Sequence, residues 1–109
     1  MFSFPFGPKN VSAAEAYERL GTSGHVLLDV RTREEVRAES IPGALHISLD
    51  RLETEAEQLK KYTSVHVICR SGGRSSTAAN LLRGLGITHV ASVEGGLLAW
   101  QKAGFPVSR

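Results

Sequence analysis

Short apolar runs alternate with helix-like segments along most of the chain. Runs such as HVLLDV (25–30) and VHVIC (65–69) carry apolar residues at odd and even positions alike, as expected of strands buried on both faces. This order predicts an α/β domain with a parallel sheet and helices on both faces. Right-handed crossovers would bring the carboxyl ends of the strands to one edge, where ligands of such sheets bind.

Periodicity and capping residues place the individual elements. The sequence predicts helices over 13–20, 32–39, 50–62, 75–86 and 97–104, and strands over 25–30, near 46–47, over 65–69 and over 89–93. The first helix has a capping-box signature, in which Ser12 accepts the Glu15 amide and the Glu15 side chain reaches back to the Ser12 amide.

The composition argues against several classes of protein. The chain has 109 residues, the size of one domain, with 13 lysines and arginines against 11 acidic residues. The resulting charge of +2 is too small to indicate a nucleic-acid partner. One cysteine rules out internal disulfides and multi-cysteine metal sites, and the four histidines lack helical ligand spacing. We therefore expect no metal and no other cofactor.

Residues 1–10 form a phenylalanine-rich tail ahead of the domain predicted for residues 11–109. Pro5 argues against an interior strand, so the rings either pack on the domain surface, form a dimer contact or partly cover a site. The tail lacks the features of a secretory signal, and no apolar run approaches the ~20 residues of a membrane span. With the free cysteine, these features predict a cytoplasmic protein without a membrane partner.

The segment VICRSGGRSS (67–76) carries the strongest functional signal. A buried strand ends at Cys69 and a helix begins near Ser75, so the turn between them must be tight. Gly72 and Gly73 allow backbone conformations that let successive amides point inward as an anion nest. The first turn of the following helix adds further N–H donors and the positive end of its dipole.

A thiol at the floor of such a nest should ionise readily, because the amides stabilise the thiolate and lower the pKa. Arg70 and Arg74 would add positive charge at the rim, although Arg70 could equally be a solvated side chain. The alternative is that Cys69 is a small core residue that closes an apolar strand. The Gly-Gly pair and the flanking arginines favour a nucleophile.

Three stretches resemble a known family. They are DVRTREEVRAESIPGALHISL (29–49), VICRSGGRSSTAANLL (67–82) and VEGGLLAWQKAGFPV (93–107). In this order they resemble the rhodanese domain of sulfurtransferases, and most of all the single-domain rhodaneses. The resemblance covers nearly the whole chain after residue 10, and it implies a five-stranded parallel sheet with helices on both faces.

The resemblance also implies roles for residues. Cys69 would be the catalytic nucleophile, and Asp29 and Arg31, in a D-x-R motif, would hold neighbouring loops. The substrate- or persulfide-binding loop would consist of Arg70, Ser71, Gly72, Gly73, Arg74 and Ser75. The residues of EGG…W would be structural; they are Glu94, Gly95, Gly96 and Trp100.

One pair of residues departs from the family pattern. Glu39 and Ser40 stand where the family usually has Gly-His before the sequence IPGA. We expect this change to alter a turn and one wall of the pocket. It does not touch the nucleophile, but it leaves substrate preference open.

The implied reaction is the transfer of sulfane sulfur. The Cys69 thiolate would attack the outer sulfur of thiosulfate or a similar anion, release sulfite and keep a persulfide. An external acceptor such as cyanide or a thiol would then remove the sulfur, because the chain has no second cysteine to resolve the persulfide. If a protein is the donor or acceptor, the chain would act as a persulfide carrier.

Phosphatases of the same fold suggest a weaker alternative. Their signature places an arginine six positions after the cysteine, whereas here that position is Ser75 and the arginine, Arg74, comes one residue earlier. A shorter loop favours one sulfur atom over a tetrahedral phosphate. Arsenate reduction is a similar minor alternative.

Overall fold

One sheet of five parallel strands organises residues 9–109, the part of the chain that the computed structural model describes. The strands are β1 Asn10–Val11, β2 His25–Asp29, β3 Leu45–His46, β4 Ser64–Ile68 and β5 Val90–Val93. They lie in the order β1-β5-β4-β2-β3, and every neighbouring pair is parallel. The five-stranded parallel sheet implied by the family resemblance is confirmed. Most of the phenylalanine-rich tail lies outside the described residues.

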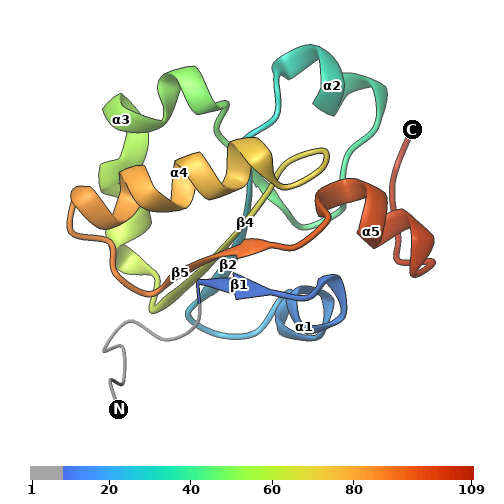
Figure 1. The fold of residues 1–109 in the computed structure, drawn as a ribbon, viewed down its shortest axis with the longest axis horizontal. Coiled ribbons are helices and arrows are strands. Elements are labelled where there is room, and N and C mark those ends of the chain that lie inside the picture. Colours follow the sequence, from blue (N-terminus) through green and yellow to red (C-terminus); the bar gives the residue numbers. More distant parts are fainter. Residues whose placement is uncertain (1–8) are drawn as a thin grey trace.

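Helices cover both faces of this sheet. They are α1 Ala13–Arg19, α2 Arg33–Ala38, α3 Leu52–Glu55, α4 Gly73–Gly84 and α5 Gly96–Lys102, with 3-10 turns η1 Leu49–Arg51 and η2 Ala56–Lys61 around α3. Figure 1 shows α3 and α4 on one face of the sheet and α1 and α5 on the other. Within residues 9–109, none of the helices has the length and apolarity that a membrane span requires.

Two clusters of buried side chains hold the layers together. Leu28 and Val67 point to the α4 side of the sheet and pack in one cluster with Leu82. Their neighbours Leu27 and Ile68 point to the opposite side and pack in a second cluster that contains Trp100. The strands are therefore buried on both faces, as their continuous apolar runs predicted.

Several boundaries differ from the sequence prediction. The helix predicted over 50–62 is wrong as one element, because Arg51 and Glu55 adopt φ near −105° with ψ near 0° and divide it into 3-10 and α segments. Leu52, Ala56 and Leu59 nevertheless remain buried on one side. Helical spacing therefore identified the buried face but not the type of helix.

Local hydrogen bonding explains two further differences. Ser12 accepts the Glu15 amide at 3.0 Å as predicted, but the complete reciprocal box forms at Thr32 and Glu35, where none was predicted. α4 begins at Gly73 rather than near Ser75, because Gly72 takes a φ of 114° and serves as its N-cap.

Two histidines lie side by side at the amino-terminal edge of the sheet. His25 of β2 and His66 of β4 are 7% and 5% exposed, and their ring centroids are 4.3 Å apart. His25 Nε2 and His66 Nδ1 have no hydrogen-bond partner among the described residues. Burial lowers the pKa of both rings to about 4, with smaller contributions from the charge of Arg19 on both and of His66 on His25. Both rings are therefore neutral in the folded protein near neutral pH.

This histidine pair predicts acid-sensitive stability. The folded-state pKa values lie below 6.5, so the unfolded chain binds more protons as the pH falls from 6.5 towards about 4. The free energy of unfolding should be highest above pH 6.5 and should decrease as the pH falls towards about 4. The decrease should be on the order of 3 kcal/mol for each ring that becomes charged. Urea unfolding at a series of pH values measures this slope.

His66→Gln provides the specific test. It removes one titrating ring, so the unfolding free energy should depend less on pH even if the variant is less stable at neutral pH. Thr63→Ala, at an exposed position of the same edge, removes no titrating group; it is the control and should keep the wild-type slope. Equal slopes in wild type and His66→Gln would contradict the assignment.

Candidate active site

Cys69 directly follows β4, the central strand, at the carboxyl edge of the sheet. Its side chain is 1% exposed. The loop that follows the cysteine runs between β4 and α4 and lies beside α5, as Figure 1 shows. The sheet topology therefore brings the predicted nucleophile to the edge where ligands of parallel sheets bind.

The Cys69 sulfur is surrounded by hydrogen-bond donors. The amides of Gly72 and Ser75 donate to Sγ at 3.1 and 3.3 Å, and Ser75 Oγ lies 3.5 Å from the same atom. The amides belong to the N-cap and the first turn of α4, so the sulfur also faces the positive end of a 12-residue helix. Two amides of the loop CRSGGRS thus point inward to the sulfur, as the sequence led us to expect of the backbone there.

These donors decide the protonation of the thiol. Burial by itself would raise the pKa of Cys69, but the side chain of Ser75 and the amides of Ser75, Gly72 and Ser71 hydrogen-bond to the sulfur. Their combined effect exceeds that of burial, so the pKa lies below its ordinary value. Such surroundings favour the thiolate over the thiol, which is the property expected of a cysteine nucleophile.

The two arginines of the loop behave differently from each other. Arg70 is exposed, whereas Arg74 is half-buried and reaches across to α2. Its guanidinium donates to both carboxylate oxygens of Glu35, at 2.6 and 2.9 Å. This pairing, together with bonds from Thr32, lowers the pKa of Glu35 to about 2 against a smaller opposing effect of burial. Arg74 adds positive charge near Cys69, but both of its terminal nitrogens already donate to the Glu35 carboxylate.

Asp29 and Arg31 form a buried ion pair behind the loop. Arg31 donates from Nε and a terminal nitrogen to the Asp29 carboxylate, with a shortest distance of 2.8 Å. The same terminal nitrogen donates to the Glu39 carbonyl at 2.7 Å. His46 Nε2, 2.7 Å from the Arg31 carbonyl, adds a link to β3. The D-x-R motif therefore connects the end of β2 to the segments after α2 and at β3.

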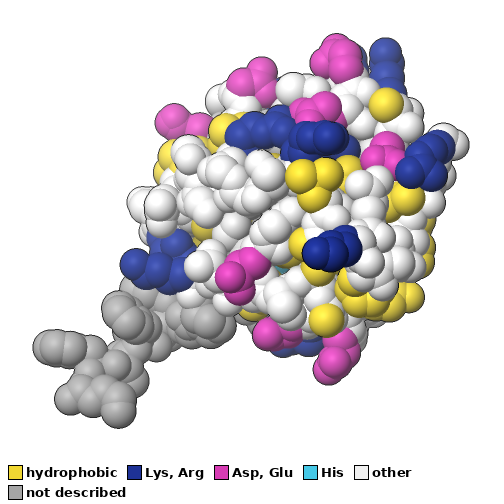
Figure 2. Space-filling view, turned by 45° about the vertical axis from the view of Figure 1, so that its right-hand side comes forward, with side chains coloured by type: hydrophobic (Ala, Val, Ile, Leu, Met, Phe, Trp, Pro, Cys, Tyr) yellow, Lys and Arg dark blue, Asp and Glu magenta, His cyan; other side chains and the backbone are white. Residues whose placement is uncertain are grey.

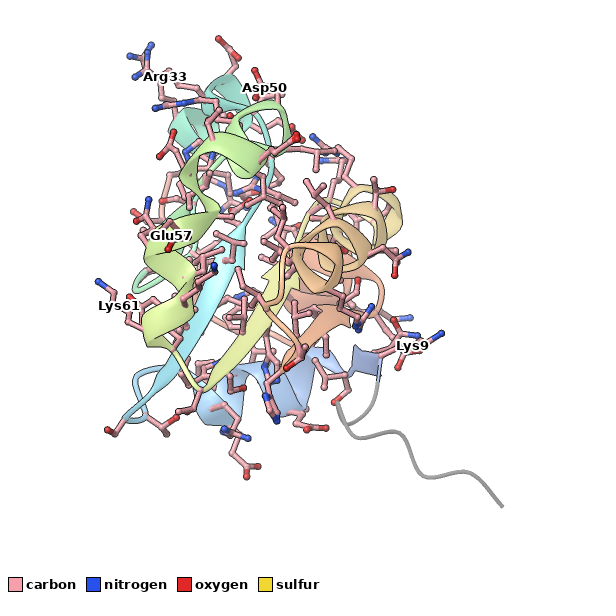
Figure 3. All side chains as sticks on the ribbon, turned by 90° about the vertical axis from the view of Figure 1, so that its left-hand side faces the viewer. Lys9, Arg33, Asp50, Glu57 and Lys61 are labelled. Atoms are coloured by element: carbon pink, nitrogen blue, oxygen red, sulfur yellow. The ribbon has the colours of Figure 1, made fainter. Side chains whose placement is uncertain are left out.

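A cleft of about 810 Å³ adjoins Arg74 at this end of the molecule. Arg33, Glu34, Asp50 and Arg51 contribute charges of both signs to its walls. Figure 3 shows Arg33 and Asp50 at the same end, beside α2 and η1. Basic and acidic side chains also alternate over the face drawn in Figure 2. The lining of the cleft is therefore of mixed charge rather than strongly basic.

Residues 12–103 match the Rhodanese-like domain family. The chain belongs to this family. A sulfurtransferase of Allochromatium vinosum is 34% identical over 91 residues, which cover 83% of this chain and 85% of that protein. The "Putative sulfur carrier protein YrkF" of Bacillus subtilis is 38% identical over 74 residues, 68% of this chain but only 40% of the relative.

Solved structures support the same fold. A protein of unknown function from Rhodopseudomonas palustris, described as a possible tyrosine phosphatase, superposes with a TM-score of 0.84 at 28% identity. The match covers 92% of this chain and 84% of that one. The rhodanese-like fold is thus shown by sequence and by structure, and the alternatives differ in chemistry rather than in architecture.

The two residues that depart from the family pattern contact the carboxyl-terminal segment of this rhodanese-like domain. Ser40 and Ser108 exchange two backbone hydrogen bonds, at 2.8 and 2.7 Å. Arg109 forms an ion pair with Glu39 at 2.6 Å. Glu39 and Ser40 thus hold the last residues of the chain against the turn that Arg31 also contacts.

Two residues important to the site were not predicted from the sequence. Glu35, the partner of Arg74, stands in a T-x-x-E signature, the sequence pattern of the capping box at the start of α2. Ser92 of β5 is buried and lies 2.7 Å from Ser75. Its only local signal is one hydroxyl in an otherwise apolar strand, VASV.

The start of α5 is hydrogen-bonded to the Cys69 loop. Leu97 and Leu98 donate their amides to the carbonyls of Cys69 and Arg70, at 2.8 and 3.1 Å. Gly96 lies against the same backbone with a φ of 54°, and a Cβ there would come within 2.5 Å of the Cys69 carbonyl oxygen. The glycine of the EGG motif is thus required by close packing against the rhodanese-like loop.

Gly96→Ala should therefore lower the free energy of unfolding by more than backbone strain alone predicts. Gly86→Ala is the matched control, because its φ is 90° and a Cβ there meets nothing within 4 Å. The control should lose roughly 1–2 kcal/mol of unfolding free energy in urea. Gly96→Ala should lose about 3 kcal/mol or more and should also shift the ionisation of Cys69. Equal losses and an unshifted thiol would contradict the packing argument.

The thiol ionisation can be measured directly because Cys69 is the only cysteine. Thiolate ultraviolet absorbance, corrected with Cys69→Ser, should rise with a midpoint below the value of about 8.5 for a free cysteine. Unfolding in urea should return the midpoint to that value. A folded-state midpoint at or above it would show that burial outweighs the hydrogen bonds.

Proposed function

We propose that this rhodanese-like domain is a sulfurtransferase that moves sulfane sulfur through a persulfide on Cys69. Thiosulfate or a similar small anion would be the donor, and cyanide or a thiol would be the acceptor. The observation that carries the proposal is the ring of donors around Sγ, in which the Gly72 and Ser75 amides lie within 3.3 Å. Such fixed donors stabilise anionic sulfur without reorganisation during the reaction.

The chemistry balances in two displacement steps. The Cys69 thiolate attacks the outer sulfur of thiosulfate, a new sulfur–sulfur bond forms, and sulfite leaves with the electron pair of the broken bond. The acceptor then attacks the outer sulfur of the persulfide, and the Cys69 thiolate leaves with its pair. Cyanide becomes thiocyanate, and no external oxidant or reductant is needed. The acceptor must be external because the chain holds no second cysteine.

The burial of Cys69 supports a small donor. With its side chain 1% exposed, Sγ is most easily reached by a single projecting atom such as the outer sulfur of thiosulfate. An aryl phosphate would need a wider cradle and an arginine free to bind its oxygens, whereas Arg74 is held by Glu35. We therefore favour sulfur transfer over phosphatase chemistry. We also propose a cytoplasmic location, where the single thiol stays reduced.

A persulfide carrier is the second candidate, and the similarity to the Bacillus subtilis sulfur carrier favours it. In that case a partner protein would load Cys69 and another would unload it. The same thiolate and the same amides would serve both functions. The two differ only in whether small molecules suffice for turnover.

Thiosulfate and cyanide separate these possibilities. The wild-type protein should form thiocyanate, and mass spectrometry should show one added sulfur atom on Cys69 when cyanide is omitted. Cys69→Ser should lose both signals, with activity reduced by a factor of at least about 1,000 because no other nucleophile replaces the thiolate. Loading without turnover would instead identify a carrier. Full activity in Cys69→Ser, or hydrolysis of an aryl phosphate without loading, would overturn the proposal.

A further inference from the structure

A buried serine on β5 extends the hydrogen bonds around Cys69 by one residue. Ser92 is 2% exposed, and its neighbours in the strand are Val90, Ala91 and Val93. Its hydroxyl lies 2.7 Å from Ser75 Oγ, which in turn lies 3.5 Å from the Cys69 sulfur. The three side chains therefore form a line from β5 to the thiol.

The number of hydroxyl protons limits which of these groups can donate and which can accept. Ser75 has one hydroxyl proton and three neighbouring acceptors, which are the Cys69 sulfur, Ser92 Oγ and the Gly72 carbonyl at 3.1 Å. When the sulfur is protonated, the S–H group donates to Ser75, and the Ser75 proton turns to one of the other two. When the sulfur is an anion, its charge makes it the strongest of the three acceptors and attracts the Ser75 proton, and Ser75 Oγ is then free to accept from Ser92.

Ser92 is placed to donate that hydrogen bond to Ser75 Oγ. Its nearest hydroxyl contact is Ser75 Oγ, whereas Ser76 Oγ is 3.5 Å away and has a better acceptor in the Gly72 carbonyl, at 2.9 Å. A hydroxyl that accepts a hydrogen bond becomes a stronger donor, because chains of hydrogen bonds polarise one another in a low-dielectric interior.

We propose that Ser92 is a positioning residue for Cys69, because its hydroxyl donates to Ser75 and so directs the Ser75 proton to the anionic sulfur. It does not touch the sulfur itself and acts only through Ser75. The inference deepens the proposed function, since it concerns the nucleophile of the same site. Its test measures the ionisation of Cys69 and requires no sulfur donor. The role of Ser92 and the proposed sulfur transfer can therefore fail separately.

The test is the ionisation of Cys69 in a set of serine variants, followed by thiolate absorbance. Ser92→Ala should raise the midpoint by roughly half to one pKa unit, the effect of one hydrogen bond. Ser75→Ala should raise it further, because it removes the direct donor. Thr77→Ala is the control: Thr77 is an exposed hydroxyl of the same helix that bonds to the Gly73 carbonyl, and its loss should leave the midpoint in place.

A double-mutant comparison excludes a merely structural role. Adding Ser92→Ala to Ser75→Ala should produce no further shift, because the route from Ser92 to the sulfur is already broken. Ser92→Thr keeps the hydroxyl and should keep the wild-type midpoint, and it provides a folded comparison if Ser92→Ala is unstable. An unchanged midpoint in Ser92→Ala, equal shifts with and without Ser75, or a shift in Ser92→Thr as large as that in Ser92→Ala would each overturn the inference.

Discussion

The hydrogen bonds to the Cys69 sulfur are the interaction around which the rest of the site is arranged. A thiol that is 1% exposed would remain protonated if burial alone acted on it. The amides of Gly72 and Ser75 donate the hydrogen bonds that water would donate to an exposed thiolate. Because they belong to the backbone, their positions are fixed more firmly than those of flexible side chains. The geometry of that backbone is therefore the constraint that the surrounding elements must satisfy.

Each neighbouring element fixes this backbone in a different way. Gly72 takes a left-handed conformation that starts α4 immediately after the loop. From the other side, α5 donates two amides to the carbonyls of Cys69 and Arg70. Arg74 ties the first turn of α4 to Glu35 of α2. The loop is consequently held by three helices, and the sulfur donors cannot reorient independently of the fold.

The sequence predicted the parts of this site that are local. A strand, two glycines and a helix occur within ten residues, so the nest around Cys69 could be inferred from spacing alone. The contacts with Glu35 and Ser92 could not, because they join residues 39 and 17 positions apart and depend on how the strands are ordered. The two-residue strand β1 was missed for a related reason, since it is too short to show a period and exists through its pairing with β5.

The division of charge at the site bears on which anion it can hold. If arginines were the principal anion receptor, a tetrahedral phosphate would gain two-pronged hydrogen bonds, which are strong and directional. Here the fork of Arg74 is satisfied by Glu35, and binding a phosphate there would leave a carboxylate without its partner. The backbone amides remain, and those of Gly72 and Ser75 converge on the sulfur of Cys69 itself. The site would thus stabilise anionic sulfur on the cysteine through its backbone, with the arginine acting at a distance through its charge.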